Sequence, residues 1–223
     1  MGAVSERDLV IKLVRHGESE QNTGRMSALD VGDHLIPLSP NGREQALAVG
    51  RKIGRAFVEG SLAYTSPYKR TRETLAAIFE SCGIELPGGR GLYEDPRLRE
   101  VEHGYDDVAG QEALRKTHGW FYYRFRGGES PADCYDRTSS FLESMMRQVE
   151  RKQAERVLIV THGLAIRCFV MRFMHLTVEQ FDALANPGNC DVVTITAKST
   201  LENPLFVSGH WGVTGLGLRE DAS

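Results

Sequence analysis

A junction between an apolar run and a charged loop lies at Leu13-Val14-Arg15-His16-Gly17-Glu18-Ser19-Glu20-Gln21-Asn22. The apolar and β-branched residues 9–14 predict a buried strand. Charge begins at the carboxyl end of this strand, which is the edge where open α/β sheets hold their ligands. Gly17 allows the sharp turn that this position requires. Because Arg15 can grip an anion through its planar fork and His16 can act as a nucleophile, the junction predicts an anion site, although the triplet alone fits a charged surface loop equally well.

The bulk composition predicts one α/β domain. The chain has 223 residues, of which 41% are hydrophobic and 26% charged, and this is enough for one sizeable core. We therefore treat residues 1–223 as a single domain. The formal net charge of -3 gives no basic field for nucleic acid, so a bound anion must be held by a few converging cations.

Cysteine spacing and the N-terminal residues indicate the cellular compartment of the protein. The four cysteines are Cys82, Cys134, Cys168 and Cys190. They form no Cys-x-x-Cys pair, so neither a zinc site nor a redox pair is predicted, and free thiols favour a reducing compartment. Residues 1–6 contain no apolar signal core, and no apolar run is long enough to span a bilayer. We expect a soluble, cytoplasmic protein without a membrane partner.

Strands and helices alternate along the chain. Apolar runs predict strands at 9–14, 62–65, 156–161, 192–195 and 205–207. Helix start signals and apolar periodicity predict five helices. The first begins at Pro40, and its apolar positions continue as far as Phe57. The others cover 67–82, with Ser66 as the cap, Pro131 to about Arg151, 164–174, and a shorter stretch from Thr177. The alternation predicts a three-layer α/β/α sandwich with a mainly parallel central sheet. The Gly-rich tail from about Gly212 is expected to be flexible.

An excursion around residues 100–128 interrupts this alternation. Within it, the stretch 112–126 contains five aromatic residues, namely Trp120, Phe121, Tyr122, Tyr123 and Phe125. Packing against the core is the favoured interpretation of these rings, and a wall over the site is the alternative.

Four segments carry chemistry that fits together. Two predicted strands end in His-Gly, at His16 and His162. Arg70 opens a predicted helix, and acids lie within 98–103. If these ends meet at one sheet edge, the pocket has imidazoles, guanidiniums and a carboxyl group, which suits phosphoryl transfer. The sequence contains no thiolate phosphate loop, Asp-x-Asp, Walker loop, Gly-x-Ser-x-Gly or His-Glu-x-x-His, so the motifs of competing chemistries are missing.

Five blocks in this order resemble the histidine phosphatase superfamily, which includes the cofactor-dependent phosphoglycerate mutases. The blocks are 13–22, 65–74, 98–100, 128–130 and 160–163, and the resemblance runs from about Leu9 to Val193. It implies a phosphoglycerate mutase-like fold. The stretches 94–100, 120–125 and 128–137 look similar to a subgroup of short, broad-range acid phosphatases.

The resemblance also implies the site residues. The catalytic residues are His16, Glu100, His162, Arg15 and Arg70, and the substrate-binding residues are Asn22, Arg15, Arg70, His162 and Gly163. In this scheme His16 becomes the phosphohistidine and Glu100 is the proton donor. Arg15, Arg70 and His162 hold the phosphoryl group, and His162 is expected to be a cationic donor. No metal and no cofactor are required, except that a mutase would use 2,3-bisphosphoglycerate.

Neighbouring residues compete for two of these roles. Arg72 is the alternative to Arg70, whose role the family pattern favours. Glu102 and His103 are the alternatives to Glu100. A solvated or supporting side chain is the simpler interpretation of all three alternatives.

Other polar residues have simpler interpretations too. Asn22 fits a turn-stabilising role as well as it fits a phosphate pocket. The remaining histidines, outside the blocks, are His34, His118, His175 and His210. We interpret them as surface or core residues, although His34 lies in a loop that can border the substrate.

Phosphomonoester hydrolysis through a phosphohistidine is the function that the sequence favours, because the chain lacks the longer insertions typical of mutases. A phosphoglycerate mutase is the second candidate, and a non-catalytic phosphate-binding module is the third. The implied partners are a small phosphorylated substrate and inorganic phosphate as the product. The loops 24–38 and 108–128 carry no transferable code for the substrate, and the sequence leaves the oligomeric state open.

Overall fold

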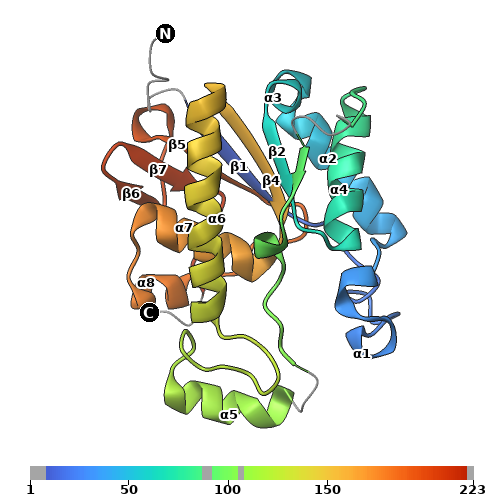
Figure 1. Ribbon diagram of the computed structural model, residues 1–223, viewed down its shortest axis with the longest axis vertical. Coiled ribbons are helices and arrows are strands. Elements are labelled where there is room, and N and C mark those ends of the chain that lie inside the picture. Colours follow the sequence, from blue (N-terminus) through green and yellow to red (C-terminus); the bar gives the residue numbers. More distant parts are fainter. Residues whose placement is uncertain (1–8, 87–91, 105–107, 220–223) are drawn as a thin grey trace.

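A seven-stranded sheet forms the middle layer of the computed structural model, which describes residues 9–86, 92–104 and 108–219 (Figure 1). The strands are β1 Val10–Arg15, β2 Leu62–Thr65, β3 Leu92–Glu94, β4 Arg156–Thr161, β5 Val192–Ala197, β6 Phe206–Ser208 and β7 Trp211–Thr214. They lie in the order β3-β2-β4-β1-β5-β7-β6. The first four strands of this order are parallel, as predicted, and the other three continue the sheet in antiparallel pairing.

Helices cover both faces of the sheet. The helical elements are α1 Ala28–Val31, η1 Asp33–Leu35, α2 Pro40–Ile53, α3 Arg55–Glu59, α4 Lys69–Ser81, η2 Pro96–Leu98, α5 Val108–His118, α6 Pro131–Lys152, α7 Gly163–Met174, α8 Val178–Ala183 and η3 Lys198–Thr200. Helices α2 and α4 lie on one side of the sheet, and α6 and α7 lie on the other (Figure 1). Leu13 belongs to the core on the α6 and α7 side and Val14 to the other core, because successive strand side chains face opposite ways. The predicted three-layer α/β/α sandwich is thus confirmed.

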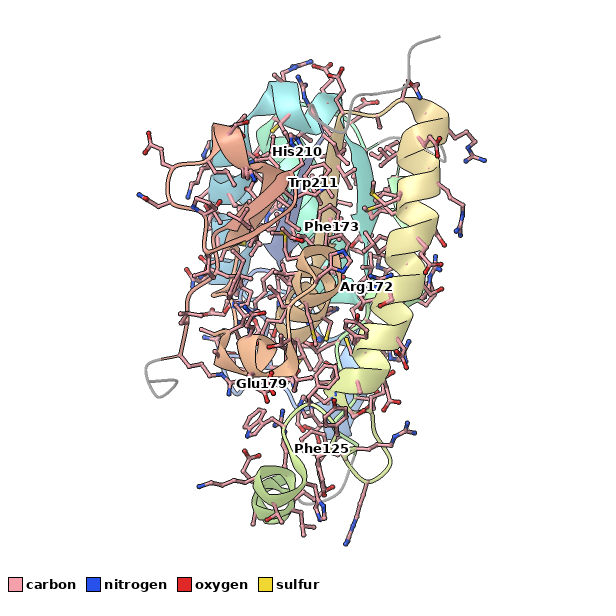
Figure 2. The ribbon with its side chains drawn as sticks, turned by 90° about the vertical axis from the view of Figure 1, so that its left-hand side faces the viewer. Phe125, Arg172, Phe173, Glu179, His210 and Trp211 are labelled. Carbon is pink, nitrogen blue, oxygen red and sulfur yellow. The ribbon has the colours of Figure 1, made fainter. Side chains whose placement is uncertain are left out.

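The tail from Gly212, predicted to be flexible, belongs to the sheet as far as Thr214. Strand β7 pairs with both β5 and β6, and Val213 is fully buried opposite Ile195. Trp211 packs on Phe173 of α7 with 5.3 Å between ring centroids (Figure 2). The prediction was wrong because these apolar side chains anchor the strand despite its glycines.

Most helix ends follow their local signals. The helix from Pro40 ends before Gly54, whose φ of 86° breaks the helical backbone, so Phe57 lies in the separate α3. The capping boxes at the starts of α6 and α8 are formed by Ser130 and Thr177 with the residues three positions on. Among the described residues, no helix has the length and apolarity that crossing a bilayer requires.

The excursion packs against the rest of the domain, which is the interpretation that the sequence favoured. Phe121 and Phe125 are buried, whereas Tyr122 is exposed. The ring of Phe121 lies 5.2 Å from that of Phe181 in α8. Phe125 lies between α5 and the other layers (Figure 2). These rings therefore attach the excursion to α7 and α8.

The loop after β1 lies unusually close to the first turn of α2. A Cβ placed on Gly42 would lie 1.9 Å from the carbonyl oxygen of Glu18, and a Cβ on Gly17 would lie 2.4 Å from the carbonyl oxygen of Gly42. Only glycine fits such an approach of two backbones. The hydroxyl of Ser39, the N-cap of α2, donates to Glu18 at 2.6 Å and supports the same contact.

We expect Gly42→Ala to lower the free energy of unfolding by about 1–3 kcal/mol, because the added methyl group must push the loop after β1 away. Denaturant titration followed by circular dichroism measures the change. The neighbouring exposed Asn41, changed to Ala, is the control and is expected to stay within about 0.5 kcal/mol of the wild type. Equal stability of the two variants would contradict the close approach.

Candidate active site

The carboxyl ends of β1 and β4 bring two predicted site residues together. Arg15 is the register partner of Thr161, and the backbone N–H of His16 donates to the carbonyl of Thr161 at 2.9 Å. The rings of His16 and His162 lie 5.2 Å apart between centroids, and both residues are buried. Two imidazoles from distant segments thus meet at one edge of the sheet.

His16 has one ring nitrogen fixed and one available. Its Nδ1 lies 2.7 Å from the carbonyl oxygen of Gly17, and because a carbonyl only accepts, Nδ1 carries the proton and Nε2 the lone pair. Burial, followed by the charge of Arg70, lowers the pKa of His16 to about 3. The ring is therefore neutral near pH 7, with a lone pair suited to nucleophilic attack.

His162 is held by two contacts. Its Nε2 lies 2.9 Å from Oγ of Ser66, and its Nδ1 lies 3.4 Å from Nη2 of Arg70. A guanidinium only donates, so Nδ1 accepts and Nε2–H donates to Ser66. Complete burial lowers the pKa of His162 well below its ordinary value, and the charge of Arg70 acts in the same direction. The neutral ring is therefore favoured over the cationic form that the sequence predicted.

Ser66 serves the site rather than a helix end. The sequence predicted that it caps a helix from Pro67, but α4 begins at Lys69 and its cap residue is Tyr68, which makes no side-chain cap hydrogen bond. The buried hydroxyl of Ser66 contacts His162 and also accepts from the backbone N–H of Tyr68 at 3.4 Å. This correction assigns Ser66 to the histidine pair.

Arg70 reaches the histidines from the first turn of α4. Its side chain is buried, and Nη1 donates to Oδ1 of Asp33 at 2.7 Å and to the carbonyl of Asp33 at 2.8 Å. Nη2 donates to Oδ2 of Asp33 at 3.2 Å. The carboxylate of Asp33 therefore fills the fork that could otherwise hold a phosphoryl group. Arg72, the alternative, is exposed and pairs with Glu94 at 3.8 Å, away from the histidines.

Arg15 offers a second guanidinium. Its Nη1 donates to the carbonyl of Pro187 at 2.7 Å, whereas its buried Nε has no hydrogen-bond partner. The charges of both Arg15 and Arg70 lower the pKa of His16, so both lie near its ring. The Nε–H of Arg15 is therefore a donor beside His16 that no described protein group accepts from.

The segment that carries Glu100 is tied to the site by Arg137 of α6. Arg137 Nη1 donates to the carbonyls of Arg97 and Arg99 at 2.7 and 2.8 Å, and its Nη2 donates to that of Glu100 at 3.1 Å. The hydroxyl of Thr161 donates to the carbonyl of Leu98, which lies within the same run, at 2.6 Å. The acid segment is therefore attached directly to β4.

The carboxylate of Glu100 lies near the guanidiniums. It accepts from the backbone N–H of Val101 at 3.0 Å, and its charge favours the cationic forms of Arg15 and Arg137. Of the two alternatives, His103 is exposed and lies 4.8 Å from the ring of Phe125. Glu102 stays an alternative, because its charge acts on Tyr68, whose ring contacts His162.

The structure places Asn22 in a turn. Its Oδ1 accepts from the backbone N–H and the hydroxyl of Ser19, both at 3.0 Å, and from Nδ2 of Asn189 at 3.4 Å. The same Nδ2 donates to the carbonyl of His16 at 3.0 Å. Asn22 therefore supports the loop, as the turn-stabilising interpretation holds. Gly163 begins α7 directly after His162.

Four contributors to the site were not predicted, namely Asp33, Ser66, Arg137 and Asn189. Ser66 and Arg137 lie in stretches that the resemblance covers, so a signal for them existed. Asp33 and Asn189 lie in loops without periodicity, and their contacts depend on the tertiary fold. Among the described residues, no group of three or more His, Cys, Asp or Glu side chains is arranged to hold a metal.

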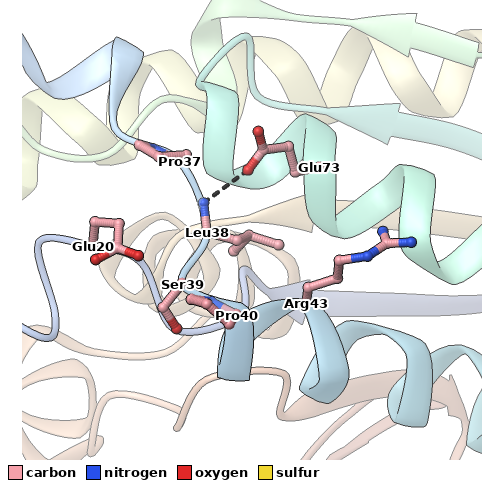
Figure 3. A pocket seen from close by; sticks show the side chains of 7 residues that line it. All are labelled: Glu20, Pro37, Leu38, Ser39, Pro40, Arg43 and Glu73. Carbon is pink, nitrogen blue, oxygen red and sulfur yellow. Dashed lines mark hydrogen bonds between the residues drawn. The ribbon is translucent and has the colours of Figure 1, made fainter.

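A pocket of about 550 Å³ lies near the candidate active site, but residues other than the predicted site residues line it (Figure 3). Its lining residues are Glu20, Pro37, Leu38, Ser39, Pro40, Arg43 and Glu73. The backbone N–H of Leu38 donates to Glu73 at 2.8 Å across it. None of the predicted catalytic residues lines this pocket, so we do not assign the chemistry to it.

Comparisons with known proteins show the family to which the chain belongs. Residues 11–203 match the family model of the histidine phosphatase superfamily, branch 1. The chain is 38% identical over 213 residues to the phosphoglycerate mutase-like protein AT74H of Arabidopsis thaliana. This alignment covers 84% of this chain and 75% of the relative. It is 26% identical over 291 residues to the broad-range acid phosphatase DET1 of Saccharomyces cerevisiae, which covers 87% of each.

The fold is also similar to the folds of solved structures. A mycobacterial glucosyl-3-phosphoglycerate phosphatase in complex with inorganic phosphate has a TM-score of 0.68 at 21% identity, over 92% of this chain and 95% of that one. This match confirms the phosphoglycerate mutase-like fold. With a family match over residues 11–203, the chain belongs to the histidine phosphatase superfamily.

Proposed function

We propose that the chain hydrolyses small phosphomonoesters through a phosphohistidine at His16. Members of its superfamily are phosphatases or mutases. The observation that carries the proposal is the buried, neutral ring of His16, whose Nδ1 is fixed on Gly17 and whose ring lies within the influence of Arg15 and Arg70. A neutral nucleophile beside two cations suits attack on a phosphoryl group.

In the first step, Nε2 of His16 attacks phosphorus in line with the ester oxygen. The N–P bond forms while the P–O bond to the alcohol breaks, and protonated Glu100 gives its proton to the leaving oxygen. Arg15 and Arg70 donate hydrogen bonds to the nonbridging oxygens, whose charge they neutralise. His162 lies beside His16 and contributes a further polar contact.

In the second step, water attacks the phosphohistidine. The carboxylate of Glu100 takes a proton from the water, the N–P bond breaks, and His16 regains its lone pair as inorganic phosphate leaves. Arg137 holds the backbone on both sides of Glu100, which keeps the carboxyl group in reach for both proton transfers. The scheme contains no step that needs a metal or a cofactor.

A phosphoglycerate mutase is the second candidate, favoured by the similarity to AT74H. A mutase would need 2,3-bisphosphoglycerate to keep its histidine phosphorylated and would have to exclude water from it. The similarity to DET1 over 87% of each protein supports the hydrolase. A non-catalytic phosphate-binding module is the third candidate.

We expect His16→Ala to lower kcat for p-nitrophenyl phosphate by roughly 10³-fold or more, because the nucleophile is lost. The assay contains excess EDTA, and the control is the exposed His118 of α5, changed to Ala, which is expected to keep full activity. Unchanged activity in His16→Ala would refute the proposal. Isomerisation of phosphoglycerate that depends on added bisphosphoglycerate would favour the mutase instead.

We expect Asp33→Asn to strengthen inhibition by inorganic phosphate, because the carboxylate of Asp33 and the phosphate compete for the fork of Arg70. The inhibition constant should fall roughly tenfold, as a charged hydrogen bond no longer opposes binding. Asp30→Asn, an exposed change in the neighbouring α1, is the control. A weaker phosphate affinity in Asp33→Asn would mean that Asp33 orients Arg70 for phosphate rather than competing with it.

A further inference from the structure

Ser66 lies where β2 ends, beside the strand that leads to His162. Its backbone N–H donates to the carbonyl of Val160 in β4 at 3.1 Å, and the residue is completely buried. The hydroxyl of Thr71 donates to the carbonyls of Ser66 and Tyr68 at 2.9 and 2.7 Å, which closes the turn between β2 and α4. The strand and the turn together therefore fix the position of the Ser66 side chain.

The hydroxyl of Ser66 has one donor hydrogen and two acceptor lone pairs. One lone pair accepts from the backbone N–H of Tyr68 at 3.4 Å, and Nε2 of His162 lies 2.9 Å from the same oxygen. Among the described residues, this oxygen has no third hydrogen-bond partner. Toward Nε2 the hydroxyl has two roles open to it. It accepts when Nε2 carries the proton, and it donates when Nε2 has the lone pair.

The contact of His162 with Arg70 favours the first of these roles. Nη2 of Arg70 lies 3.4 Å from Nδ1 and only donates, so Nδ1 has the lone pair and Nε2 carries the proton. The hydroxyl of Ser66 then accepts from Nε2–H, and its own hydrogen has no acceptor among the described residues. A buried donor without an acceptor costs free energy. This arrangement therefore leaves one donor unsatisfied.

A phosphoryl group in place of the Asp33 carboxylate changes this count. Nη2 of Arg70 donates to Oδ2 of Asp33 at 3.2 Å, and it is the same nitrogen that contacts Nδ1 of His162. A phosphoryl oxygen that accepts from Nη2 therefore comes close to Nδ1. If Nδ1 carries the proton, it donates to this oxygen, Nε2 has the lone pair, and the hydroxyl of Ser66 donates to Nε2. Every donor of the network then has an acceptor.

The charges of the site favour a neutral His162 in both arrangements. Arg15 and Arg70 carry two positive charges, which a phosphoryl dianion balances. A cationic ring would add a buried charge without a partner, and burial followed by the charge of Arg70 lowers the pKa of His162. The ring therefore keeps its charge and changes the nitrogen that carries its proton, because Nδ1 gains one proton and Nε2 loses one.

We propose that Ser66 is a positioning residue that lets His162 change its tautomer when a phosphoryl group binds. The hydroxyl accepts from Nε2–H while Asp33 pairs with Arg70, and it donates to Nε2 once the phosphoryl group has replaced Asp33. His162 thereby becomes a neutral donor to the phosphoryl group through Nδ1–H. This role rests on the proposed function, because it requires that the phosphoryl group binds beside His16 and Arg70.

Isotopically labelled ring nitrogens test the tautomers directly, because the protonated and unprotonated nitrogens of an imidazole resonate far apart. Proton–nitrogen correlation spectra of the full chain are recorded without phosphate and with saturating inorganic phosphate, and His162→Gln assigns the signals. The proton of His162 is expected on Nε2 without phosphate and on Nδ1 with it. A proton that stays on Nε2, or a ring protonated on both nitrogens in the phosphate complex, would overturn the proposal.

Substitutions separate the role of Ser66 from that of the turn. In Ser66→Ala, Nε2 lacks a partner in both tautomers, so phosphate no longer satisfies the last unpaired group, and calorimetry should show roughly tenfold weaker binding of inorganic phosphate. Ser66→Thr keeps a hydroxyl and should restore the affinity. The control is Thr71→Val, which loosens the same turn but removes bonds only to backbone carbonyls, and it should keep the tautomer change. Wild-type affinity in Ser66→Ala, or loss of the tautomer change in Thr71→Val, would show a purely structural role.

Hydrolysis of p-nitrophenyl phosphate separates this role from the proposed function. Hydrolysis by a chain whose His162 keeps its proton on Nε2 in the phosphate complex would overturn the role of Ser66 and leave the hydrolase standing. The tautomer change without hydrolysis would support the role of Ser66 and refute the hydrolase.

Discussion

The parallel pairing of β1 with β4 is the contact on which the site depends. Its register sets Arg15 opposite Thr161, so the residues that follow each strand, His16 and His162, leave the sheet side by side. A slip of one residue would turn the apolar side chains of β1 to the wrong layer, so the two cores enforce the register that the histidines need. The stability of the sandwich and the geometry of the chemistry therefore have the same origin.

Burial then determines the state of the histidines. Both rings are removed from water beside guanidiniums, and both effects favour the neutral form. The hydrogen bond from His16 to Gly17 selects the tautomer, which leaves Nε2 with its lone pair. Buried arginines without a carboxylate partner would destabilise the fold. Asp33 is this partner for Arg70. The carboxylate of Asp33 is thus the anion that neutralises Arg70 in this structure.

Much of the fold, and the meeting of the candidate site residues at one sheet edge, could be predicted from the sequence, because local rules act there. The strands at 9–14 and 156–161 are mostly apolar runs. His16, Arg70 and His162 follow strand ends or a helix start, where topology alone brings side chains together. The sequence does not determine which of the loop acids serves as proton donor. The structure likewise leaves both Glu100 and Glu102 near the site.

Tertiary contacts explain what the sequence did not predict. Asp33 reaches Arg70 only after the loop before α2 folds over α4, and Asn189 reaches His16 from a loop after α8. The tail from about Gly212 looks irregular in sequence, yet its residues as far as Thr214 belong to the sheet because β5 offers strand β7 an edge.

Trapping of the covalent intermediate tests the central claim most directly. The protein is mixed with a phosphomonoester, quenched in alkali within milliseconds and digested, since phosphohistidine survives alkali but not acid. Mass spectrometry is predicted to find a phosphoryl group on His16 during turnover and none in the absence of substrate. Turnover without phosphorylation of His16, or phosphorylation of another residue, would contradict the account.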